Sequence, residues 1–99
     1  MPKLVSIKPS TKSDKKMMAV FDNDGRTKTI HFGASGMDDY TKTKDKEQRA
    51  RYRTRHAKDL TTSASKTGMS AGALSYYVLW GNSTSKRENI KQYKRKYNL

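Results

Sequence analysis

The sequence predicts an α+β fold: a small three-stranded antiparallel sheet in the N-terminal third, followed by about three short helices. Three observations predict it. Short runs of β-branched and aromatic residues alternate with turn residues as far as Phe32. Apolar side chains recur at helical spacing from Asp45 onward. The 99 residues are enough for one small domain, 1–99.

The sheet is expected from three runs, Lys3–Lys8, Lys15–Asp22 and Arg26–Phe32, within residues 1–33. Asn23-Asp24-Gly25 is a strong hairpin signal, because Asp and Gly tolerate the positive φ of a tight turn. A one-residue slip in register would exchange Met17 for Met18 and Ala19 for Val20 on the core face. The positions predicted to face the core are Val5, Ile7, Met17, Ala19, Phe21, Ile30 and Phe32.

A loop and a basic helix are expected over residues 34–60. Asp45 followed three residues later by Gln48 resembles a capping box. The strict alternation of arginine over 49–55 leaves a strand as the alternative. The helix is favoured because the cap, the alanines and the lack of turn residues agree with it. A thin stripe at four-residue spacing is predicted to face inward: Tyr52, His56 and Leu60.

Residues 61–69 are rich in Ser and Thr and are predicted to form a mobile loop. Residues 70–97 are predicted to form an aromatic helix and a basic C-terminal helix, the second opened by a capping box of Ser85 and Glu88. The residues predicted to pack inward from these two helices are Leu74, Tyr77, Val78, Ile90, Tyr93 and Tyr97.

Charge is the most informative part of the composition, since 22 basic against 9 acidic side chains give a net charge of +13. Residues 42–58 carry eight basic and two acidic side chains and residues 86–99 carry six and one, together +11 of the total. The absence of cysteine excludes disulfides and thiol chemistry. No apolar run reaches the roughly 20 residues of a membrane span. We therefore expect no membrane insertion.

The basic segments are the predicted binding surfaces. Guanidinium groups bond phosphate and carboxylate in a bidentate fork, and lysines suit contact with a phosphate backbone. The alternative is a solvated helix whose arginines pair with the nearby acidic residues. The residues predicted to contact a polyanion or partner are Arg49, Arg51, Arg53, Arg55, Lys58, Lys86, Arg87, Lys91, Lys94, Arg95 and Lys96.

Catalytic groups are scarce. His31 and His56 are expected to be packed or hydrogen-bonded, and the adjacent Asp38 and Asp39 are expected to cap the Tyr40 segment or pair with lysines. Gly33-Ala34-Ser35-Gly36 lacks the residues of a nucleotide-binding loop and is interpreted as a turn of unusual φ. We expect no catalytic site, metal, cofactor or small-molecule substrate.

An ordered set of short elements carries a resemblance that covers most of the chain from about Met18 onward. The elements are Ile30 to Gly36, Asp39-Tyr40-Thr41, Lys44-Asp45, Arg49, Tyr52, Arg55-His56, Ser70 to Ser75 and Val78 to Gly81. This set resembles a family of small basic uncharacterised proteins of nucleocytoplasmic large DNA viruses that infect algae and protists. No enzymatic activity is assigned to this family, so the resemblance implies a viral setting more than a mechanism.

Two hypotheses follow. The first is a non-enzymatic structural protein of the virion, a minor capsid or internal cement component whose basic helices contact acidic surfaces of other virion proteins, capsid proteins among them, or the genome. The second is a sequence-nonspecific DNA- or RNA-binding protein for genome packaging or in the infected cell. The expected location is the virion, or otherwise the cytoplasm or nucleus of the host cell. Net charge alone does not choose between a phosphate backbone and an acidic protein surface.

Overall fold

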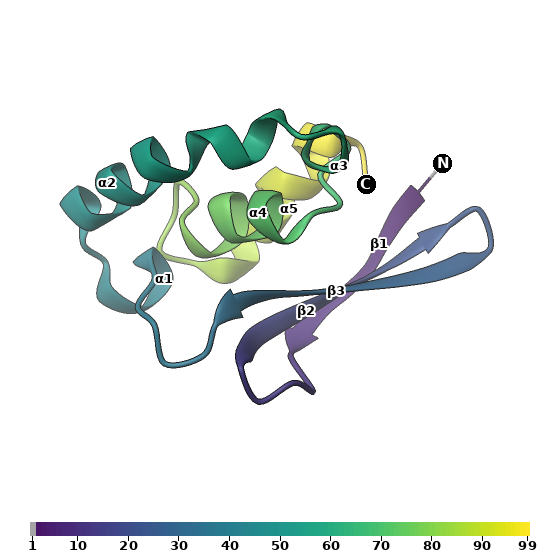
Figure 1. Cartoon of the computed structure of the whole chain (residues 1–99), viewed down its shortest axis with the longest axis horizontal. Coiled ribbons are helices and arrows are strands. Elements are labelled where there is room, and N and C mark those ends of the chain that lie inside the picture. The colour runs from purple at the N-terminus through teal and green to yellow at the C-terminus, as the bar shows by residue number, and fades with distance from the viewer. Residues whose placement is uncertain (1) are drawn as a thin grey trace.

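The computed structural model describes residues 2–99 and confirms the α+β class. Helices cover one face of a three-stranded sheet of order β1-β2-β3 and leave the other face open (Figure 1). The strands are β1 (Pro2–Pro9), β2 (Lys15–Asn23) and β3 (Arg26–Ala34). The helical elements are α1 (Tyr40–Thr43), α2 (Lys46–His56), the 3-10 turn η1 (Ala57–Thr61), α3 (Ser63–Lys66), α4 (Ala71–Leu74), the π-helical turn η2 (Ser75–Leu79) and α5 (Lys86–Tyr97).

The predicted core face is correct except at Val5, which is 64% exposed. The register shifts between Leu4 and Ser6, so that Leu4 pairs with Phe21 and Ile7 pairs with Ala19. Val5 is the extra residue of a bulge, and bulges leave one residue of a strand unpaired. The bulge turns both Leu4 and Ile7 toward the helices, although their odd spacing would place them on opposite faces of a regular strand.

The core forms where the sheet meets the aromatic helices. Phe21 and Phe32 are fully buried and lie in one cluster with Leu74, Val78 and Tyr93. Three successive side chains, Val78 to Trp80, are buried at the end of η2. The amide of Trp80 donates to the carbonyl of Ser75, five residues back, as in a π-helix. A continuous α-helix was predicted here, and Leu79 was not among the residues predicted to pack inward. Core packing of Trp80, favoured over stacking on bases, is confirmed.

The helix starts agree with the predictions in part. Asp45 accepts the amides of Glu47 and Gln48, and Ser85 accepts the amide of Glu88. The reciprocal bonds expected of a capping box are absent among residues 2–99. The amide of Asp45 instead donates to the Thr43 hydroxyl, which itself donates to Gln48.

The segment 61–69, predicted to be a loop, contains the short helix α3. Its anchor is Ser65, a buried serine whose hydroxyl is within hydrogen-bond distance of the Asp59 carbonyl and of the hydroxyls of Thr62 and Ser70. Gly68 also contacts α5, since its carbonyl accepts from the Tyr93 hydroxyl. Polar side chains therefore hold this segment in place, which their composition alone did not indicate.

Candidate functional site

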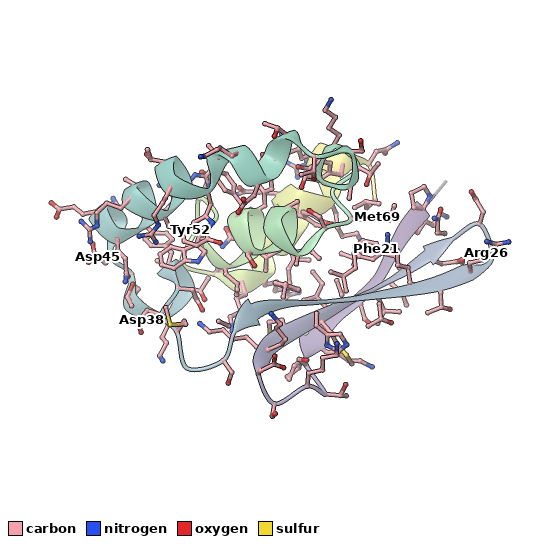
Figure 2. All side chains as sticks on the ribbon, in the orientation of Figure 1. Phe21, Arg26, Asp38, Asp45, Tyr52 and Met69 are labelled. Atoms are coloured by element: carbon pink, nitrogen blue, oxygen red, sulfur yellow. The ribbon has the colours of Figure 1, made fainter. Side chains whose placement is uncertain are left out.

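A cleft of about 640 Å³ opens between α2 and the end of β3, with α4 and η2 forming its inner wall. Figure 2 labels Tyr52 below α2 and Asp38 on the loop that follows β3, and both residues line this cleft. We call this surface the basic cleft. Its charged lining comes from β2, the loop after β3, α2 and η1, and consists of Lys15, Lys16, Asp38, Arg51, Arg55, His56 and Asp59.

The four arginines of α2 divide into two pairs with different environments. Arg49 donates from Nε to the carbonyl of Gly81 (2.6 Å) and from a terminal nitrogen to Asn82 (2.7 Å). Arg53 donates to the carbonyl of Trp80 (2.8 Å). Positive charge is favourable at these carbonyls, because they lie at the C-terminal end of a helical segment. Arg49 and Arg53 thus join α2 to η2.

Arg49 and Arg53 also lie close to aromatic rings. The guanidinium carbon of Arg53 lies 4.3 Å from the ring centre of Tyr76, and that of Arg49 lies 5.4 Å from the ring centre of Tyr40. Both distances suit cation–π contact. These two arginines of the predicted binding set are therefore occupied by intramolecular contacts.

Arg51 and Arg55 form the second pair; they are exposed and line the basic cleft. Neither forms an ion pair with a carboxylate in the described part of the chain. The same is true of Lys15, on the opposite wall. The acidic residues that were the alternative partners for the arginines, Asp38, Asp39, Asp45 and Glu47, form no ion pair with either of them in the described structure. Three cations on two facing elements are thus free to bind an anion.

A stack of three rings lies beneath this pair. The ring centre of Tyr52 is 4.1 Å from that of His56 and 4.3 Å from that of Trp80, with near-parallel planes. Nδ1 of His56 lies 2.8 Å from the carboxylate of Asp59. Burial, together with the negative charge of Asp59, raises the pKa of the Tyr52 hydroxyl. The stack fixes the face of α2 that lines the cleft, and His56 is packed and hydrogen-bonded as predicted.

Lys16 and Asp39 connect the two walls at the base of the loop after β3. The Lys16 ammonium lies 2.8 Å from the carboxylate of Asp39, which is buried and also accepts from Thr41. Burial acts to raise the pKa of Asp39, but the hydrogen bonds from Lys16 and Thr41 and the charge of Lys16 outweigh it, so that this pKa is lowered. Asp38 lies 3.9 Å from Lys42. The predicted pairing of these carboxylates with lysines is confirmed.

The remaining residues of the predicted binding set lie outside the cleft. Lys58 is exposed on η1, and Lys96 lies 5.4 Å from the ring centre of Tyr77. The others are exposed along α5: Lys86, Arg87, Lys91, Lys94 and Arg95. None of these side chains lines the basic cleft.

The other candidates from the sequence, His31 and the loop Gly33 to Gly36, have structural explanations. Nδ1 of His31 lies 2.7 Å from the hydroxyl of Ser10, which connects β3 to the loop after β1. Gly33 and Gly36 have φ values of +79° and +82°, as the interpretation of a turn requires. Within residues 2–99, no three His, Cys, Asp or Glu side chains converge as a metal site would need, and no helix is long and apolar enough to cross a membrane.

Residues 5–56, just over half of the chain, match the model of a family of unknown function, DUF5754. The chain belongs to this family. No curated protein and no solved structure matches it. The part matched by the DUF5754 model contains the whole of α2 and thus both Arg51 and Arg55, as well as Lys15. The inner wall of the cleft, on α4 and η2, lies outside it.

Sequence reasoning missed several cleft residues. Lys15 and Lys16 stand outside the two charge-rich segments, and nothing in their spacing indicates that β2 begins opposite α2. Asp59 was not expected to bond His56, although a spacing of three residues on a helical segment is a usable signal. The cleft depends on tertiary contacts between strands and helices distant in sequence.

Proposed function

We propose that this member of DUF5754 is a non-enzymatic nucleic-acid-binding protein whose main contact surface is the basic cleft. The observation that carries the proposal is that three cations line the same cleft, Arg51 and Arg55 from α2 and Lys15 from β2. None of the three forms an ion pair with a carboxylate among residues 2–99. Guanidinium and ammonium groups on facing walls suit a row of phosphates.

This surface is better suited to contact the phosphate backbone of a nucleic acid than the edges of its bases. Proteins that read base edges in a duplex use several directed contacts from amide or guanidinium groups. The cleft lining contains one amide side chain, that of Gln48. Electrostatic binding of this kind is insensitive to sequence and weakens steeply with salt. The net charge of +13 supports fast, nonspecific association.

The test is a titration of a labelled oligonucleotide followed by fluorescence anisotropy at several salt concentrations. The cleft variant is Arg51→Ala with Arg55→Ala, and the matched control is Lys91→Ala with Lys94→Ala, which removes the same charge from exposed positions on α5. Each lost phosphate contact costs about fivefold in affinity at 0.1 M salt, so the cleft variant should bind about 25-fold more weakly. The control should change by less than about threefold. Equal losses in the two variants would show that binding is not centred on the cleft.

A second candidate concerns the cations outside the cleft. Arg87, Lys91, Lys94 and Arg95 remain exposed on α5, where they leave a separate surface for an acidic partner. Together with the resemblance to proteins of large DNA viruses, this surface supports a role as a minor structural component of a virus particle. Quantitative proteomics of purified particles tests it, since absence of the protein from particles would end this proposal while leaving nucleic-acid binding untouched.

A further inference from the structure

A second concave surface adjoins the basic cleft. It encloses about 770 Å³ and is more open, and its lining includes Lys42 and Lys86. The two concavities have four lining residues in common: Lys15, Lys16, Gly36 and Met37. The two concavities are therefore neighbours that meet at the start of β2 and the loop after β3. We call the whole surface the basic track.

Cations occur along the full length of this track. Arg51 and Arg55 line the basic cleft, Lys15 lines both concavities, and Lys42 and Lys86 line the second. Lys42 also lies 3.9 Å from the carboxylate of Asp38, and both of these side chains are exposed. The carboxylate of Asp39 in the second concavity is bonded to Lys16, so their charges offset each other. A chain of phosphates is a ligand that positive charge spread over two adjoining concavities complements.

The middle of the track adds an apolar contact. Met37, common to both concavities, is 63% exposed, and the other large apolar side chain exposed to this degree in the described structure is the bulged Val5. The polarizable thioether of an exposed methionine makes favourable contacts with aromatic rings, such as those of nucleic-acid bases. A nucleic-acid strand with unpaired bases has such rings available, whereas a duplex keeps them stacked inside.

We propose that the basic track holds single-stranded nucleic acid, its backbone passing from Arg51 and Arg55 across the loop at Met37 to Lys42 and Lys86. This inference rests on the proposed function. Each concavity has the volume of a site for one small ligand, within the usual range of about 300–1,000 Å³. A single strand can bend from one concavity into the next. Duplex DNA is stiff over about 150 base pairs and does not follow so short a path without a large bending cost.

The experiment compares a labelled single-stranded 12-mer, the duplex of the same sequence and a labelled dinucleotide by fluorescence anisotropy at 0.15 M salt. The wild-type protein should bind the single-stranded 12-mer at least tenfold more tightly than the duplex. Lys42→Ala with Lys86→Ala should weaken binding of the 12-mer about tenfold, because a single strand loses roughly 0.7 of a released counterion for each phosphate contact. The dinucleotide, too short to reach both ends, should lose much less affinity in this variant.

The matched control is Lys91→Ala with Lys94→Ala, which carries the same net charge and alters exposed residues off the track. Duplex binding equal to or tighter than single-strand binding would overturn the inference. So would a Lys42/Lys86 variant that behaves like this control. In either case a selective loss in the Arg51/Arg55 variant would leave the proposed function standing, whereas no binding of any of the three ligands would overturn both.

Discussion

The ammonium of Lys16 lies 2.8 Å from the carboxylate of Asp39 and joins the second strand to the residue that precedes α1. Both side chains are largely shielded from water, and the Thr41 hydroxyl donates to the other oxygen of the same carboxylate. This cluster anchors the loop that lies between the two halves of the basic track. Its loss should therefore affect stability and the shape of the binding surface together.

Asp39→Asn should destabilise the fold by about 2–3 kcal/mol at pH 7, since it leaves the Lys16 charge without its partner. The pKa of Asp39 is lowered in the folded state, so its contribution is complete above the ordinary Asp pKa of about 3.9 and is lost as pH falls through the lower folded value. Urea unfolding of wild type and variant at pH 7, 5, 4 and 3 measures this. The difference between them should shrink below pH 4; a constant difference would contradict the assignment.

Arg53→Ala should destabilise the fold, whereas Arg55→Ala should leave its stability almost unchanged. Arg53 bonds a carbonyl at the end of η2 and lies over an aromatic ring, so its loss should cost about 2 kcal/mol. Arg55 is exposed, and its loss should change the free energy of unfolding by less than about 0.5 kcal/mol. Thermal and urea denaturation measure both. Equal destabilisation would show that the two arginines do not have different roles.

Gly33→Ala should be more harmful than Gly25→Ala. Both glycines have φ near +80 to +90°, but a Cβ at Gly33 would lie 2.7 Å from a methyl of Leu79, whereas nothing lies within 4 Å of one at Gly25. Backbone strain alone predicts about 1 kcal/mol at Gly25. Strain and overpacking together predict about 2–4 kcal/mol at Gly33. Urea titrations of the two variants compare the values, and the difference between them isolates the contact with η2.

Leu4→Ala should cost about 2–3 kcal/mol, because it removes a buried side chain of the core cluster, opposite Phe21 on the neighbouring strand. Val5→Ala, one residue away, should change stability by less than about 0.5 kcal/mol, because Val5 faces solvent at the bulge. Equilibrium unfolding measures both. The reverse order of effects would place the bulge at a different residue of β1.

Much of the fold was predictable because its signals are local. Asn23-Asp24-Gly25 fixes the hairpin, and the side chains of Asp45 and Ser85 fix the starts of α2 and α5. The bulge at Val5 was not predictable, since it depends on which of two neighbouring apolar residues packs better against the helices. The division of the α2 arginines was not predictable either. It arises because the carbonyls of Trp80 and Gly81 approach one side of α2, a contact between segments about 30 residues apart.

The burial of Phe21 and Phe32 has a consequence for how the chain can be divided. Their shared face of the sheet is covered by side chains from the C-terminal third, among them Leu74, Val78 and Tyr93. The segment matched by the family model ends at residue 56, before any of these is reached. Expressed alone, that segment would present a bare apolar sheet to water and would aggregate or stay unfolded. The boundary of the family match is thus a boundary of sequence similarity and not of an autonomous folding unit, which requires the chain through α5.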